Sequence, residues 1–137
     1  MEEAQRELVQ ESWRKLVPEA ERAAILFYTR LFEEDPELRS LFHGDMAEQG
    51  QRLMNMLGTA IDELDKLEAM APTIRELGKR HAAFGVKPEH YETFADALLW
   101  TLQTILGADF YPEVEEAWIA LYDFMAENMK QGAGAAP

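Results

Sequence analysis

The segment Pro72-Thr-Ile-Arg-Glu-Leu-Gly-Lys-Arg-His81-Ala-Ala-Phe-Gly85 contains the pattern on which the fold depends. A proline at its start and a glycine at its end are typical of the first turn and the C-terminal cap of a helix. Between them Ile74, Leu77 and His81 recur at the spacing of one helical face, so the pattern predicts a helix with a histidine facing the core. A lone histidine in such a place is more often a hydrogen-bonded core residue than a ligand.

The sequence on both sides of this segment is also predicted to be helical. Apolar residues recur at intervals of three and four, and the two-residue alternation that marks strands is nearly absent. The expected helices cover residues 3–16, 19–34, 36–42, 48–64, 72–84, 88–105 and 112–130. Gly58, in the middle of one of them, costs about 1 kcal/mol relative to alanine, which predicts a close helix crossing there. The predicted fold class is therefore all-α, with about seven to eight helices.

Length and composition limit the chain to one globular domain. With 137 residues, 47% of them apolar, it is long enough to bury a core and too apolar to be disordered. The absence of cysteine excludes disulfides, iron–sulfur clusters and cysteine nucleophiles. We expect the domain to cover residues 1–131 and the Gly- and Ala-rich residues 132–137 to form a flexible tail.

Charge narrows the classes of partner. The 26 acidic residues outnumber the 13 Lys and Arg residues, which gives a formal net charge of −13. Such a surface repels phosphate backbones and anionic lipids, so neither nucleic acid nor a membrane is expected as a partner. No apolar run reaches the ~18 residues of a membrane span, and the N-terminus lacks the pattern of a signal peptide, so a cytoplasmic location is expected.

Three polar side chains on three different predicted helices face the apolar interior: Tyr28, Gln49 and His81. No acidic residue, serine or second histidine accompanies them, so they resemble the lining of a shared apolar pocket more than a hydrolytic site. One imidazole without protein co-ligands holds a metal when a macrocycle supplies the other donors, as haem does. His43 and His90 are expected to be exposed, and the sequence contains no phosphate-binding, dinucleotide-binding or Ser-nucleophile motif.

Motifs in a fixed order resemble the globin family over about residues 8–130. The first three are Glu-Leu-Val-Gln-Glu-Ser-Trp13, Phe27-Tyr-Thr-Arg-Leu-Phe32 and Asp35-Pro-Glu-Leu-Arg-Ser-Leu-Phe42. The order is completed by Leu77-Gly-Lys-Arg-His81, Phe84-Gly-Val-Lys87, Ala117-Trp118 and Leu121-Tyr122. In these motifs the chain is similar to single-domain bacterial haemoglobins, to neuroglobins and to the globin domain of flavohaemoglobins. The resemblance implies the globin fold, with the helices packed around a haem pocket.

The resemblance also implies roles for individual residues. His81 matches the proximal iron ligand of haem b, and Tyr28 and Gln49 match distal positions that hydrogen-bond a ligand. Arg52, together with Lys79 or Arg80, matches the partners of the haem propionates. The other haem-pocket residues that it implies are Phe42, Leu53, Leu77, Val86, Tyr91 and Phe94.

The chain departs from the family pattern at two places. Flavohaemoglobins carry a glutamate late in the last helix that polarises the proximal histidine, and the equivalent place here, near Ala133, has no acid. Neuroglobins have a distal histidine where this chain has Gln49, so iron with two histidine ligands is not expected.

The function implied by the resemblance is reversible binding of dioxygen at ferrous haem, as in oxygen transport. Hydrogen bonds from Tyr28 and Gln49 would give this binding high affinity. No catalytic residue is assigned. One alternative is nitric oxide detoxification, in which the globin acts as a nitric oxide dioxygenase with a separate reductase as partner. Another is a gas or redox sensor, or an interaction module, on the same fold. Carbon monoxide is a further expected ligand.

Overall fold

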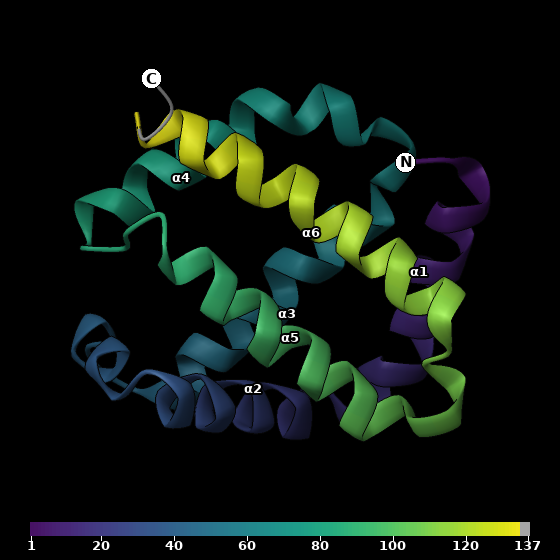
Figure 1. The fold of residues 1–137 in the computed structure, drawn as a ribbon, viewed down its shortest axis with the longest axis horizontal. Coiled ribbons are helices and arrows are strands. Elements are labelled where there is room, and N and C mark those ends of the chain that lie inside the picture. The colour runs from purple at the N-terminus through teal and green to yellow at the C-terminus, as the bar shows by residue number, and fades with distance from the viewer. Residues whose placement is uncertain (135–137) are drawn as a thin grey trace.

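Six α-helices make up most of the structure, a computed structural model that describes residues 1–134 (Figure 1). The helices are α1 Glu3–Leu16, α2 Ala20–Glu34, α3 Met46–Asp62, α4 Ala71–Ala83, α5 His90–Leu106 and α6 Pro112–Gly132. The short 3-10 helices between them are η1 Val17–Glu19, η2 Pro36–Leu41, η3 Leu64–Met70 and η4 Gly107–Asp109. Residues 1–134 contain no strand, and the four 3-10 helices bring the number of helical segments to ten. The all-α prediction is confirmed.

Capping side chains set where the helices begin. Asp45 precedes α3, and its Oδ1 accepts a hydrogen bond from the Ala47 backbone N–H at 2.8 Å, so α3 begins at Met46 rather than at the predicted residue 48. Before α5 the Lys87 backbone N–H donates to Nδ1 of His90 at 3.0 Å. His90 is therefore half-buried at the start of α5, and the prediction that it is exposed is wrong.

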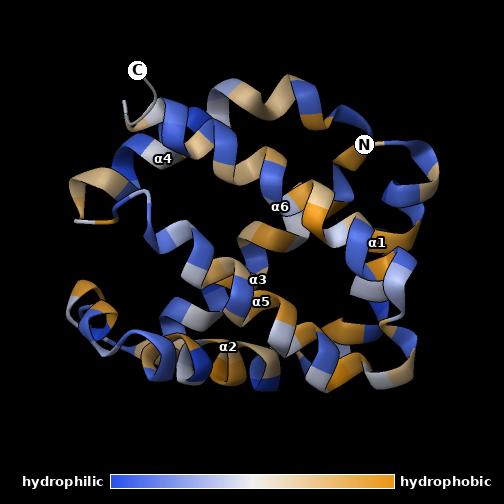
Figure 2. Ribbon diagram, in the orientation of Figure 1, coloured by the Kyte–Doolittle hydropathy of each residue, from blue (hydrophilic) through white to orange (hydrophobic). Residues whose placement is uncertain are grey.

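The helices form two groups that cross each other (Figure 1). α6 packs against α4 and α1, whereas α2 packs against α5 and α3. Apolar residues gather where the helices face one another, as Figure 2 shows along α3 and α5. At one end of the molecule the α4–α5 loop contacts η2, because a Cβ added at Gly85 would lie 3.1 Å from the Leu41 side chain. This contact closes the space between the two groups at that end.

A hydrogen bond inside the core joins the first helix to the last. The buried indole of Trp118 on α6 donates to Oγ of Ser12 on α1 at 2.9 Å, and Ser12 in turn donates to the Leu8 carbonyl at 2.7 Å. The rings of Trp13 and Trp118 pack at a centroid distance of 6.3 Å. Each buried polar group in this contact therefore has a partner, which keeps the cost of burying them low.

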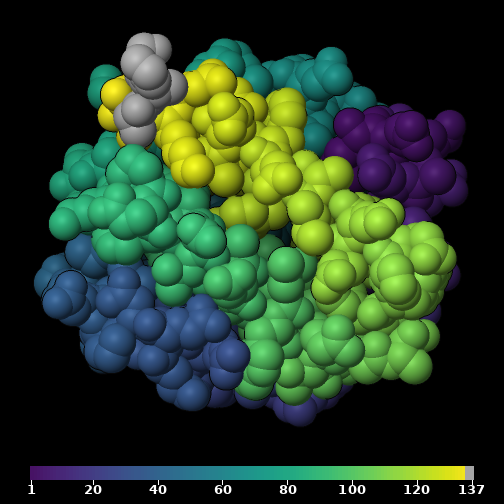
Figure 3. All heavy atoms as spheres, in the orientation of Figure 1, coloured from purple at the N-terminus to yellow at the C-terminus, as the bar shows by residue number. Residues whose placement is uncertain are grey.

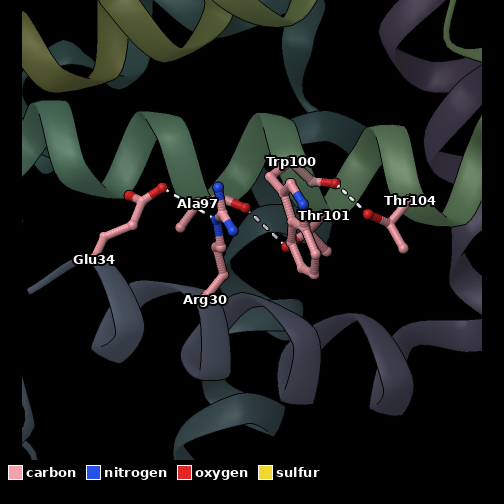
Figure 4. A network of polar contacts seen from close by, with 6 residues as sticks. All are labelled: Arg30, Glu34, Ala97, Trp100, Thr101 and Thr104. Atoms are coloured by element: carbon pink, nitrogen blue, oxygen red, sulfur yellow. Dashed lines mark hydrogen bonds and ion pairs between the residues drawn. The ribbon is translucent and has the colours of Figure 1, made fainter. Parts of the chain in front are cut away.

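At the surface of the contact between α2 and α5, the guanidinium of Arg30 lies over the ring of Trp100 (Figure 4). The Arg30 guanidinium lies 5.1 Å from the Trp100 ring centre and pairs with Glu34 at 3.1 Å. Below them the buried Thr101 hydroxyl donates to the Ala97 carbonyl at 2.8 Å, so it needs no partner from α2. The aliphatic part of the arginine and the indole together shield this helix contact from water.

The closest helix crossing lies between α4 and α6, where glycines replace larger residues. A Cβ at Gly78 would overlap the backbone of Met129, and a Cβ at Gly132 would overlap the backbone of Arg75. The crossing predicted at Gly58 is wrong, because a Cβ there would lie 3.6 Å from the Trp13 ring, an ordinary contact. α4 is thereby held directly against the backbone of α6.

α6 extends one residue into the predicted C-terminal tail. The helix continues through Gly132, the first residue of that tail, and residues 135–137 lie outside the described residues. Side chains of α5 and α6 cover much of the face shown in Figure 3. Within residues 1–134 no helix is both long and apolar enough to cross a membrane.

Candidate functional site

A cavity of about 560 Å³ lies among α2, α3, α4, α5 and α6, within the range of about 300–1,000 Å³ that is usual for cofactor sites. Its wall is mostly apolar. It contains every predicted site residue except Lys79: Tyr28, Phe42, Gln49, Arg52, Leu53, Leu77, Arg80, His81, Val86, Tyr91 and Phe94. The structure thus brings residues from five helices and two loops to one place.

His81 on α4 is held in a defined orientation by its own helix. Its Nδ1 lies 2.9 Å from the Leu77 carbonyl oxygen, one turn earlier. A carbonyl oxygen only accepts, so Nδ1 carries the proton and Nε2 keeps its lone pair. A ring fixed through one nitrogen with the other nitrogen basic is the arrangement of a metal-binding histidine.

Tyr28 on α2 presents an unbonded hydroxyl to the cavity. Its ring contacts three phenylalanines, with centroid distances of 5.1 Å to Phe27, 5.2 Å to Phe42 and 6.0 Å to Phe32. Burial raises the pKa of Tyr28 to about 12, so the hydroxyl stays protonated at neutral pH. No group of residues 1–134 accepts its hydrogen, which leaves the hydroxyl free to donate to a ligand.

Gln49 and Leu53 bring a second donor and an apolar side chain to the cavity from α3. They lie four residues apart, one helical turn, and both are half-buried in the cavity wall. An amide donor next to an apolar side chain can bind a small polar ligand while water is kept out.

Two arginines lie at the mouth of the cavity. Arg52 on α3 and Arg80 on α4 are exposed and line it, whereas exposed Lys79 does not. Arg52 has only a distant partner, Glu48 at 3.9 Å, so its guanidinium remains free for a stronger acceptor. His43 is exposed as predicted, but it also lines the cavity. The mouth therefore carries positive charge on a strongly acidic protein.

Several residues of the cavity wall are not among those predicted from the sequence. The further lining residues include Leu31, Leu41, Met56, Phe84, Tyr122, Met125, Ala126 and Met129. The Tyr122 hydroxyl donates to the Tyr91 carbonyl, and burial, followed by the charges of Tyr91, Asp123 and Asp96, raises its pKa. The helical spacing of Met125 and Met129 predicts that they face inward, and both are buried. The spacing does not distinguish a residue that packs in the core from one that borders a cavity.

The donor set fits the haem that the sequence leads us to expect. His81 supplies one basic nitrogen, the wall supplies apolar and aromatic contacts, and Arg52 and Arg80 are placed to pair with carboxylates. Within residues 1–134 no three His, Asp or Glu side chains come together as a metal site. At the end of α6 Ala133 is half-buried, and the protein hydrogen bond of the His81 ring goes to a backbone carbonyl and not to a carboxylate. The His81 ring is therefore oriented by an uncharged acceptor.

Comparison with known proteins gives a family match and several relatives. The family model described as Globin matches residues 25–129. The neuroglobin of Tetraodon nigroviridis is 29% identical over 93% of this chain and 89% of its own length. A flavohemoprotein of Vibrio cholerae is 32% identical over 80% of this chain, which corresponds to 28% of that longer protein.

Solved structures show the same fold. An engineered carbene transferase from Rhodothermus marinus, whose name assigns it as a nitric oxide dioxygenase, superimposes with a TM-score of 0.86 and 28% identity. The match covers 98% of this chain and 94% of the other. A hexacoordinated haem protein from an anhydrobiotic tardigrade superimposes with a TM-score of 0.87 at 17% identity, and covers 98% and 96% of the two chains, a likeness of fold alone.

Proposed function

Because the chain belongs to the globin family, which implies haem binding, we propose that it holds haem b through His81 and binds dioxygen reversibly and with high affinity. The observation that carries the proposal is the His81 ring, fixed by the Leu77 carbonyl with its second nitrogen free in an apolar cavity. The other cavity residues supply what such a cofactor needs.

The cofactor is held by contacts of two kinds. Phe42, Val86 and Phe94 offer apolar surface to the ring, and burial of that surface stabilises the complex by about 25 cal/mol per Å². Arg52 and Arg80 at the mouth pair with the two propionates. These two cations let an anionic cofactor bind to a protein whose net charge is −13.

Ferrous haem supplies the position at which a diatomic ligand is held. The hydroxyl of Tyr28 and the amide of Gln49, both in the cavity lining, would donate hydrogen bonds to that ligand. A dioxygen ligand takes on negative charge, and a hydrogen bond to a charged group contributes about 1.5–3 kcal/mol in a dry site. Since Tyr28 stays protonated, its donation persists through the neutral pH range.

The test is haem titration of the apoprotein followed by spectroscopy. We expect one haem per chain and a Soret band in the wild type, and a loss of affinity with an altered spectrum in His81→Ala, because the imidazole that the Leu77 carbonyl orients in the cavity is removed. Added imidazole should restore the spectrum of this variant. The control His43→Ala removes an exposed histidine at the mouth and should bind haem normally. An unchanged spectrum and affinity in His81→Ala would contradict the proposal.

A second candidate function is nitric oxide dioxygenation. It is favoured by the likeness to the Rhodothermus marinus protein over nearly the whole chain. In this reaction nitric oxide, dioxygen and one electron give nitrate, so a separate reductase has to supply the electron. Steady-state consumption of nitric oxide with NADH and a generic reductase, together with nitrate measurement, distinguishes this function from simple carriage.

A further inference from the structure

We propose that diatomic gases reach the cavity through a groove between α2 and α3, with the Tyr28 ring as the movable wall between groove and cavity. The proposal rests on the proposed function, since it concerns the access of gas to the haem site. It adds a path and a second role for Tyr28.

The groove is an apolar hollow of about 850 Å³ on the surface of the molecule. Its lining comes almost entirely from α2 and from the first half of α3. Small side chains keep it open: Ala20 and Ala24 on α2, and Ala47 and Gly50 on α3. At its floor the two helices touch, because a Cβ at Gly50 would lie 2.8 Å from the Ala24 Cβ.

The groove and the haem cavity lie on opposite sides of this helix contact. On α3, residues 46, 47, 48, 50, 51, 54 and 55 line the groove, whereas residues 49, 52, 53, 56 and 57 line the cavity. On α2 the corresponding sets include residues 24, 25 and 29 on one side and residues 27 and 31 on the other. Within residues 1–134 Tyr28 is the one residue that belongs to both walls. Movement of this side chain connects the two spaces.

The contacts of Tyr28 allow such a movement. Its hydroxyl has no acceptor among the described residues, so rotation breaks no protein hydrogen bond. Its ring is held by the three phenylalanine rings at 5.1–6.0 Å, whose attraction is weakly directional.

The groove offers an apolar gas a path to the distal side of the cavity. Its lining includes the charged residues Glu21, Arg39 and Glu48, but most of its surface is apolar. Small apolar molecules partition from water into apolar surroundings, and the groove reaches the Tyr28 ring. Gas is therefore concentrated next to the wall that separates it from the distal site.

Filling the groove tests the proposal. Thr29→Trp and Ala47→Trp each place a large ring at an exposed position of the groove lining, where the fold tolerates it. The matched control Thr59→Trp places the same ring at an exposed position of α3 that lines neither the groove nor the cavity. Association of carbon monoxide after flash photolysis of the ferrous holoprotein should slow about tenfold in the groove variants and stay within about twofold in the control.

A second measurement separates gas access from ligand binding. With zinc protoporphyrin in place of haem, quenching of the porphyrin triplet state by dioxygen reports collisions in the cavity and needs no iron–ligand bond. The groove variants should slow quenching by the same factor, and Tyr28→Ala, which removes the wall, should accelerate it.

The pattern of slowing decides the outcome. Slowing confined to the groove variants supports the path, and any other pattern, including a changed rate in the Thr59→Trp control, overturns it. Such a failure leaves a protein that takes up haem with a normal Soret band. A failure of the proposed function would instead show as the absence of that band in the wild type.

Discussion

At residue 81 the backbone of the helix determines the chemistry of the side chain. The Leu77 carbonyl accepts a hydrogen bond from Nδ1 of His81 at 2.9 Å. A backbone carbonyl oxygen has two lone pairs, so it can accept this bond in addition to the one within the helix. The acceptor is uncharged, so it orients the ring without giving it the anionic character that a carboxylate partner would.

Tyr28→Phe removes the distal hydroxyl and keeps the ring. We expect dioxygen to dissociate about tenfold faster or more, since about 1.5–3 kcal/mol of charged hydrogen bonding is lost, while carbon monoxide, which carries less charge, changes little. Stopped-flow displacement of dioxygen from the ferrous holoprotein measures this rate. The control Tyr111→Phe makes the same chemical change at an exposed position outside the cavity. A dissociation rate in Tyr28→Phe that matches this control would exclude the hydroxyl as a donor.

The positions of most cavity residues were predictable, because helical periodicity places inward-facing residues correctly. His81, Gln49 and Tyr28 were found as polar residues on apolar faces, and all three line the cavity. Lys79 lies about 200° around the helix from His81, which explains why Arg80 and not Lys79 reaches the mouth. Tyr122 and the methionines of α6 were missed, because only the three-dimensional packing shows which inward-facing residues border a space.

At the scale of the elements, the α4–α6 crossing positions the histidine. The helix that carries His81 meets the backbone of α6 at Gly78, three residues away, and again where Gly132 meets Arg75. The Arg75 guanidinium also donates to Oδ1 of buried Asn128 at 3.0 Å. These contacts hold α4 in place against α6, so a displacement of α6 would move His81.

Gly78→Ala should destabilise the protein, because its Cβ would overlap the Met129 backbone and force α4 away from α6. We expect a loss of about 1–3 kcal/mol in the free energy of unfolding, the usual cost of overpacking. The matched control is Gly58→Ala, whose Cβ would meet the Trp13 ring at 3.6 Å and which should gain up to about 1 kcal/mol from helix propensity. Urea denaturation of both variants measures the difference. Equal stability of the two would show that the crossing adjusts freely.

Helix boundaries were predictable where capping residues are visible in the sequence. Asp35 and the prolines marked the starts of η2 and α6 correctly, while the cap at Asp45 was overlooked. The sequence shows that a glycine inside a helix lowers helix stability, but it does not show which glycine packs against another helix. The close crossing predicted at Gly58 is therefore found at Gly78 instead. Two of the closest approaches, at Gly50 and Gly78, lie at glycines that drew no prediction.

For the whole molecule, repulsion among carboxylates opposes folding. The formal net charge is −13, and the five ion pairs found among the described residues are all at least partly exposed, so they compensate for little of it. Haem binding adds two further carboxylates. The stability of the protein should therefore depend on ionic strength.

Raising NaCl from ~10 to ~150 mM shortens the Debye length from about 30 to about 8 Å, so we expect the melting temperature to rise by a few degrees. Differential scanning calorimetry of the apoprotein measures the rise. The double variant Glu7→Gln/Glu11→Gln removes two exposed like charges four residues apart on α1, and should melt higher at low salt with a smaller salt effect. A melting temperature that falls with salt would show that attraction, not repulsion, dominates the surface.

The pairing of α4 and α1 with α6 has a consequence for biosynthesis. Both the helix that carries His81 and the helix that carries Ser12 find their packing partner in α6, which follows both of them in the chain. During translation the earlier helices keep apolar faces uncovered until α6 emerges from the ribosome. The core and the cavity are then completed together, so cofactor uptake cannot precede the synthesis of α6.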